Sequence, residues 1–147
     1  MWKKLLSEIA PTYTFSEPIN EDAMSHLEQQ LNVKFPPELK SLLFETDGIV
    51  EKHDYAEWFL LWSSDVILRE NLQIRSSEVL REFCQPFDNL LFFADTGCGD
   101  FFGYLIEDGV ISTPYIYMWN HEDDSRPKVA SSLEEFVVGW ATGKLFV

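Results

Sequence analysis

The segment Gly97-Cys98-Gly99, in which two glycines flank a cysteine, is a candidate for phosphate binding or cysteine chemistry. Glycine-rich loops bind phosphate groups, but a Walker loop needs Gly-Lys followed by Ser or Thr, and here Asp100 follows Gly99. A dinucleotide fingerprint needs a glycine where this chain has Phe102, and then a helix, whereas the residues that follow have the pattern of a strand. The segment therefore predicts a β-turn whose glycines supply positive φ angles.

The two cysteines, Cys84 and Cys98, are too few for a disulfide framework or a four-ligand zinc site. A nucleophilic cysteine needs a base and a stabilised thiolate, and the acids that flank Cys98 disfavour the thiolate. Cys84 follows Phe83 in an apolar setting that is typical of a core position. We therefore predict two structural thiols, as expected for a protein of a reducing compartment.

The run His-Glu-Asp-Asp at 121–124 could suggest a metal site, because hard cations bind several oxygen ligands. Four consecutive residues cannot all face one ion, and neither EF-hand spacing nor a His-Glu-x-x-His pair is present. Asp95 and Asp100 could form a carboxylate pair for acid–base catalysis, but no neighbouring pattern indicates a substrate pocket. We therefore predict no catalytic residue, no metal and no cofactor, and hence a protein that is not an enzyme.

Hydrophobic spacing and capping residues predict the helices that surround these segments. The predicted helices are a short one before Pro11, one that Asn20 caps, one that Pro36 and Pro37 open, and two pieces within 65–83 that break near Ser76. Gly48 is expected to end the helix after Pro37 as a left-handed cap. The segment from Ser132 to Glu135 is a capping box before a last helix, which Gly143 closes.

Strands are predicted where apolar and aromatic residues form short runs, at 57–62, 90–95, 101–106 and 115–119. Helices at the start, strands in the middle and a helix at the end indicate the α+β class. With 147 residues the chain is long enough for one domain. We therefore predict a single domain, residues 1–147, in which N-terminal helices and a C-terminal helix pack on a mostly antiparallel sheet.

Charge is the most unusual property of the chain, which has 25 Asp and Glu against 11 Lys and Arg, a formal net charge of −14. Nucleic acids and anionic membrane surfaces attract basic proteins, so neither is expected as a direct partner. A basic protein partner is favoured. The first residues contain no apolar signal region, and no stretch approaches the roughly 18 apolar residues of a membrane span. We therefore expect a cytoplasmic protein.

The acids are concentrated between Arg81 and Arg126, an interval that contains nine acids and neither Lys nor Arg. Two interpretations remain open: a solvated face, or a docking face for a basic protein. For the docking face we predict six steering charges and two aromatic anchors, although Trp119 is also a candidate core residue. The predicted partner-binding residues are Asp100, Glu107, Asp108, Tyr117, Trp119, Glu122, Asp123 and Asp124.

Three segments also carry a family resemblance. Residues 32–48 contain a hydrophobic–proline step, a Leu-rich helix and Asp-Gly. Residues 90–104 contain an apolar strand, Ala-Asp, Gly-x-Gly-Asp and Phe-Phe-Gly-Tyr. Residues 117–122 form a final strand, and residues 129–136 carry the motif Ala-x-Ser-Leu-x-Glu-Phe at the start of a helix. In order and spacing these segments resemble the SUKH superfamily, the Smi/Knr-like domains.

The resemblance implies an α+β fold and, for bacterial members, an immunity protein that binds and neutralises a toxin, often a nuclease. It implies no catalytic motif, and it implies that Gly48, Gly99 and Trp119 hold the fold. The sequence therefore predicts that an acidic surface occludes the basic active site of a cognate toxin. The alternative is a non-enzymatic regulator or scaffold that binds an endogenous protein, as eukaryotic relatives linked to cell-wall synthesis do.

Overall fold

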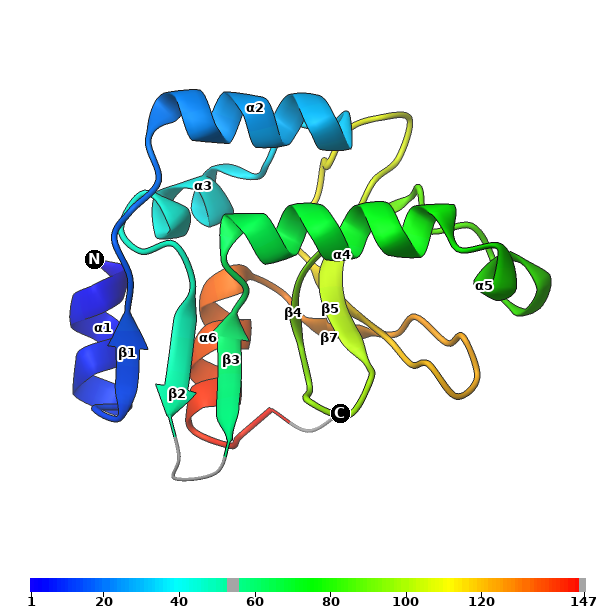
Figure 1. Cartoon of the computed structure of the whole chain (residues 1–147). Helices are drawn as coiled ribbons and strands as arrows, with labels where there is room; N and C mark the ends of the chain where they lie inside the picture. The colour runs from blue at the N-terminus through cyan, green and yellow to red at the C-terminus, as the bar shows by residue number, and fades with distance from the viewer. Residues whose placement is uncertain (53–55, 146–147) are drawn as a thin grey trace.

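The computed structural model of the chain describes residues 1–52 and 56–145, in which the strands form two antiparallel sheets (Figure 1). The first sheet has the order β1-β2-β3, with bounds Tyr13–Phe15, Ile49–Lys52 and Glu57–Leu61. The second has the order β4-β5-β6-β7, with bounds Leu90–Asp95, Phe101–Leu105, Ile116–Trp119 and Lys128–Ala130. The backbone amide of Trp62 donates a hydrogen bond of 2.9 Å to the carbonyl of Phe93, which joins the two sheets.

Helices lie on both sides of the strands. In Figure 1, α2 and α4 run across one side and contact each other, whereas α6 lies behind the first sheet. The helices are α1 (Trp2–Ile9), α2 (Glu21–Leu31), α3 (Pro37–Leu43), α4 (Ser64–Ser76), α5 (Glu78–Phe83) and α6 (Leu133–Ala141). This arrangement confirms the predicted α+β domain with mostly antiparallel pairing, and it divides the strands between two sheets. No helix in the described ranges has the length and apolar character needed to cross a bilayer.

Polar side chains at the helix starts explain where several helices begin. The side-chain oxygens of Asn20 and Ser132 accept hydrogen bonds from backbone amides three residues later, at 2.8 and 3.1 Å. Ser77 does the same for Leu80 at 3.2 Å. Because Ser77 follows α4 with an extended backbone and caps α5, it causes the break that the sequence predicted near Ser76.

The core is centred on β4, in which the first five of six residues are buried. Phe92 contacts Phe101 and Trp119, whereas Phe93 contacts Phe136 of α6, so their side chains lie on opposite faces of the strand and both faces are covered. A buried polar side chain ties α4 to the strand. The Asn71 amide donates to the carbonyls of Ile67 and Phe92 at 2.7 and 2.8 Å, and its oxygen accepts from the Phe92 amide at 2.9 Å.

The predicted role of Gly48 as a helix cap is wrong, because α3 ends at Leu43 and Phe44 is its C-cap residue. Gly48 does have a positive φ, 100°, but in the turn that leads into β2. The Thr46 hydroxyl holds this turn by donating to the Gly48 carbonyl at 2.7 Å and accepting from the Ser16 amide at 2.9 Å. The glycine therefore belongs to a buried turn rather than to a helix end.

Candidate protein-binding surfaces

The predicted steering acids do not form one continuous surface. Asp100 directly precedes β5, whereas Glu107 and Asp108 follow its end, so the two groups lie at opposite ends of the strand. Asp108 has a φ of 53° in a tight turn, which a backbone bridge between Glu107 and Val110 closes. The prediction of a single acidic face over 100–124 is therefore corrected to two separate acidic ends.

Asp100 lies against the loop between β6 and β7. One of its carboxylate oxygens accepts from the backbone amide of His121 at 3.0 Å and lies 2.6 Å from Nδ1 of the same residue. The imidazole ring covers Gly99, where an added Cβ would lie 3.1 Å from ring atoms. Asp100 therefore joins two turns at this end of the sheet, and its side chain is 19% exposed.

Asp124 is a structural residue and not a free surface charge. Its carboxylate accepts hydrogen bonds from the Gln85 amide, the Trp119 indole and the Arg126 guanidinium at 2.8, 2.8 and 3.0 Å. Burial alone would raise the Asp124 pKa, but these donors outweigh it and lower the pKa. The negative charge is thus already satisfied inside the chain, which corrects its assignment as a steering charge.

Glu122 and Asp123 are exposed in the same β6–β7 loop. Hydrogen bonds from Ser125 lower the pKa of Asp123 and hold the loop in its turn. These two carboxylates are the members of the predicted set that solvent or a partner can reach near Asp100.

Of the two predicted anchors, Trp119 is a core residue. It is 5% exposed, and its ring meets Phe87 and Phe101 edge to face, with centroids 5.0 and 5.6 Å apart. Trp119 cannot enter a partner without unfolding this cluster, so the core alternative is correct and the anchor assignment is corrected. Tyr117, by contrast, is half-buried on β6.

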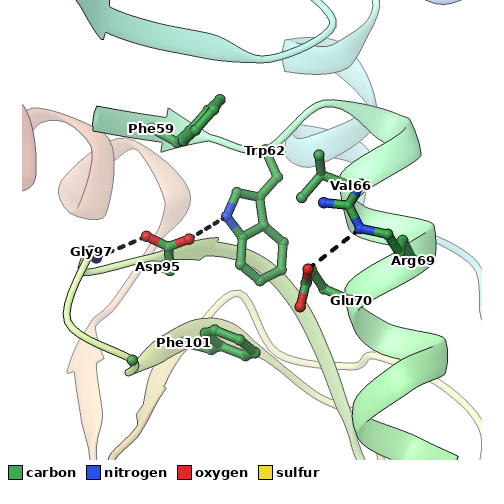
Figure 2. A pocket seen from close by; sticks show the side chains of 9 residues that line it. Phe59, Trp62, Val66, Arg69, Glu70, Asp95, Gly97 and Phe101 are labelled. Atoms are coloured by element: carbon green, nitrogen blue, oxygen red, sulfur yellow. Dashed lines mark hydrogen bonds and ion pairs between the residues drawn. The ribbon is translucent and has the colours of Figure 1, made fainter. Parts of the chain in front are cut away.

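A groove that the sequence did not reveal lies between α4 and the turn that joins β4 to β5. Figure 2 shows the buried Trp62 ring, which lines this groove between Phe101 and Glu70 of α4. The cavity has a volume of about 360 Å³. The Trp62 indole donates a hydrogen bond of 2.7 Å to Asp95, whose second oxygen accepts from the Gly97 amide at 2.8 Å.

A second hollow of about 380 Å³ shares Glu70, Gly99 and Phe101 with the first, so the two form one continuous groove. Its other lining residues are Gln73, Ile74, Ser77, Leu80 and Trp119. Phe59 of β3 also lines the first hollow and is 37% exposed, and the neighbouring Trp58, whose ring lies against Gly97, is 47% exposed. In the sequence these two aromatics have the pattern of a buried strand, which is why the groove could not be predicted.

The two cysteines lie in different environments. Burial and then the negative charge of Asp124 raise the pKa of the Cys84 thiol, so it stays protonated at neutral pH. Cys98 is exposed in its turn, where Gly97 and Gly99 have φ angles of 83° and 100°, as predicted. Within residues 1–52 and 56–145, no three His, Cys, Asp or Glu side chains gather as metal ligands would.

The chain is thus an α+β domain with separate acidic ends and an aromatic groove. A family model described as SMI1-KNR4 cell-wall, SUKH_6, matches residues 21–137. The match covers most of the chain, which therefore belongs to the SMI1-KNR4 family of SUKH domains. It includes every element from α2 to β7 and the first half of α6. The comparison with curated proteins gives no significant match.

Proposed function

We propose that this protein is a bacterial immunity protein, which binds the toxin domain of a secreted protein in the cytoplasm and blocks its active site. Membership of the SUKH family, over residues 21–137, carries the proposal, because the resemblance implies toxin neutralisation for bacterial members. The proposed toxin is a nuclease. A nuclease presents basic residues to phosphate, and a protein of net charge −14 competes for such a cleft.

The proposed mechanism is occlusion without any chemical step by this protein. Exposed acids at the two ends of β5, Glu107 and Asp108 at one and Glu122 and Asp123 at the other, accelerate the encounter through long-range attraction. Apolar and aromatic contacts then determine how long the complex lasts, because anchors that exclude water slow dissociation. The groove beside Trp62 is the concave surface that we assign to such an anchor.

The test uses the toxin domain encoded beside this gene in the genome that carries it. Co-expression of the two proteins is expected to restore growth that the toxin alone prevents, and the pair is expected to elute as one stoichiometric complex. Inhibition of purified nuclease activity at equimolar ratio would support occlusion. A neighbouring gene product that is neither bound nor inhibited would contradict the proposal.

The family description, which refers to the cell wall, favours a second candidate function. In this alternative the protein regulates an endogenous partner and no toxin is involved. Deletion of the gene distinguishes the two: a regulator's loss changes wall synthesis in a strain that lacks the toxin, whereas an immunity protein's loss has no effect in that strain.

A further inference from the structure

We propose that the groove beside Trp62 receives an arginine side chain from the protein partner, and that the neighbouring hollow receives an apolar side chain adjacent to it. The inference rests on the proposed function in one respect, since it takes a protein partner as given. It adds the surface that is used and the side-chain chemistry that this surface recognises.

The first observation is the charge of the groove. Asp95 and Glu70 both line it, and among the described residues Asp95 forms no ion pair. The two hydrogen bonds that Asp95 accepts, from the Trp62 indole and the Gly97 amide, fix its orientation. A carboxylate has about four lone-pair sites, so acceptor capacity remains for a further donor. An oriented anion with free acceptors at a cavity wall favours a cation.

The second observation is the aromatic lining. Phe101 and Trp62 meet edge to face, with centroids 5.0 Å apart, and Phe59 stands at the rim of the same cavity (Figure 2). A cation over an aromatic face is attracted by the ring quadrupole. A flat guanidinium uses both features at once, because it stacks on a ring while its N–H groups bind a carboxylate. The ammonium of lysine is a compact and strongly hydrated charge, which suits this lining less well.

The chain contains one such arrangement in its own fold. The Arg126 guanidinium lies 4.7 Å from the centroid of Phe87 and 3.0 Å from the Asp124 carboxylate. An arginine of the β6–β7 loop is thus held between an aromatic ring and a carboxylate. In the groove, Phe101 supplies the ring and Asp95 supplies the carboxylate. The partner's arginine would add the guanidinium that lies between them.

Arg69 lies at the groove rim and does not fill this position. Its Nε lies 3.5 Å from Glu70, and its side chain is 58% exposed. Exposed ion pairs of this kind are weak, with a median of about 0–1 kcal/mol. An incoming guanidinium can therefore replace Arg69 as the ion-pair partner of Glu70 with only a small loss of free energy.

The adjoining hollow determines what flanks the arginine. Ile74, Leu80 and Trp119 contribute apolar atoms there, and Phe101 lines both this hollow and the Asp95 cavity. An apolar side chain next to the arginine in the partner's sequence would occupy it and displace water. The expected recognition element is therefore a short segment with arginine beside an apolar residue.

The test uses a small probe and does not need the toxin. N-acetyl-arginine amide is titrated into the isotope-labelled protein, with N-acetyl-citrulline amide as the neutral isostere. With arginine, NMR shifts are expected at the Trp62 indole N–H and at the Gly97 and Gly99 amides, with millimolar affinity. Citrulline is expected to produce none at the same concentration. Equal shifts with both probes, or shifts scattered over the surface, would overturn the proposal.

Variants separate the groove from general charge. Glu70→Gln keeps the side-chain shape and is expected to weaken arginine binding about fivefold, as one exposed ion pair would. Glu107→Gln, at the far end of β5, is the matched control and is expected to leave the affinity unchanged. Asp95→Asn is expected to abolish the shifts, and its melting temperature shows whether the fold survives. If Glu107→Gln weakens binding as much as Glu70→Gln, bulk charge explains the effect and the proposal fails.

The same variants distinguish failure of the groove from failure of the proposed function. If the toxin domain binds and Glu70→Gln leaves its dissociation rate unchanged, the groove proposal is wrong and the immunity function stands. If arginine binds in the groove but the neighbouring toxin forms no complex, the immunity function is wrong and the groove serves another protein.

Discussion

Asp123 and Asp124 are adjacent and of the same type, yet only Asp124 has a structural role in holding the fold together. Asp123 is exposed in a turn, whereas the Asp124 side chain is 14% exposed and accepts from a backbone amide, an indole and a guanidinium. The second carboxylate therefore joins the β6–β7 loop to the segment before β4.

Asp124→Asn is expected to reduce the free energy of unfolding by about 2 kcal/mol at neutral pH, because three donors lose a charged acceptor. Asp123→Asn, its neighbour, is the control and is expected to unfold at nearly the same denaturant concentration as the parent. Urea titrations of the two variants measure this difference. Equal stability of both variants would show that Asp124 is only a surface charge.

The same contrast should depend on pH. Folding lowers the Asp124 pKa, so the stabilisation from its ionised form is fully present above the unfolded-state value, about 3.8, and is lost as pH falls through the lower folded-state pKa. The stability gap between the parent and Asp124→Asn should therefore be constant above about pH 5 and shrink below 3.8. Unfolding measured at pH 7 and pH 3 tests this sign.

Gly48 is a second residue whose replacement should measurably change the stability of the fold. Its φ is 100°, and an added Cβ would lie 3.1 Å from the backbone nitrogen of Ser63, which cannot move as a side chain could. Gly48→Ala is therefore expected to destabilise the fold by about 1–3 kcal/mol. Gly109→Ala is the control for φ alone, since its φ is 80° and nothing lies within 4 Å of its added Cβ. Equal losses for both would show that the contact with Ser63 contributes nothing.

At the scale of elements, the last helix offers the cleanest test of a cap. The Ser132 oxygen accepts from the Glu135 amide at 3.1 Å, and the Glu135 carboxylate accepts from the Ser131 amide at 2.9 Å. Ser132→Ala is expected to cost about 1 kcal/mol of stability and to leave partner binding unchanged. Ser132→Asp, which keeps an acceptor, should retain most of the stability. Thermal unfolding of the two variants measures the difference, and equal losses would argue against the cap.

Elements with caps or long apolar runs could be predicted from the sequence. Asn20 and Ser132 marked helix starts that the structure confirms, and the break expected near Ser76 falls at Ser77. The buried run of β4 and the positive φ of Gly97 were equally clear. In each case the signal is local. A cap or turn residue forms hydrogen bonds with the backbone of residues nearby in the chain, and an apolar run is visible in one short window.

Elements and surfaces that depend on distant residues could not be predicted. Strands β1 and β7 are three residues long and exist because they pair with β2 and β6. The groove beside Trp62 combines residues from β3, α4 and the β4–β5 turn, so no window of the sequence contains it. The acidic interval suggested one surface because sequence proximity does not show that β5 separates its two halves.

At the scale of the whole molecule, charge should govern how fast a partner arrives. The loop with Glu122 and Asp123 lies beyond the end of β6 that pairs with the start of β5, next to the turn that borders the groove, whereas Glu107 and Asp108 lie at the other end of β5. Glu122→Gln with Asp123→Asn should slow association with the proposed toxin partner more than Glu107→Gln with Asp108→Asn. The effect should diminish as salt rises, because screening acts over about 8 Å at physiological ionic strength.

Stopped-flow association rates at increasing salt measure this effect, and dissociation rates serve as the internal control because exposed charges mainly affect encounter. Both double variants keep their side-chain shapes, so their melting temperatures should match that of the parent. Association that is independent of salt, and equal in the two variants, would mean that the acids are only a solvated face.

The side chain of Asn71 has one more consequence. Two of its three hydrogen bonds, both with the Phe92 backbone, hold α4 against β4, the elements that bear Glu70 and Asp95 on the two walls of the groove. If the groove receives a partner segment as proposed, it is already preorganised, and the loss of conformational entropy on association falls on the incoming segment. A partner segment that is already rigid would bind more tightly than a flexible one with the same side chains. Selection on a partner that binds this groove can thus change affinity through the stiffness of its binding segment, without altering a single contact.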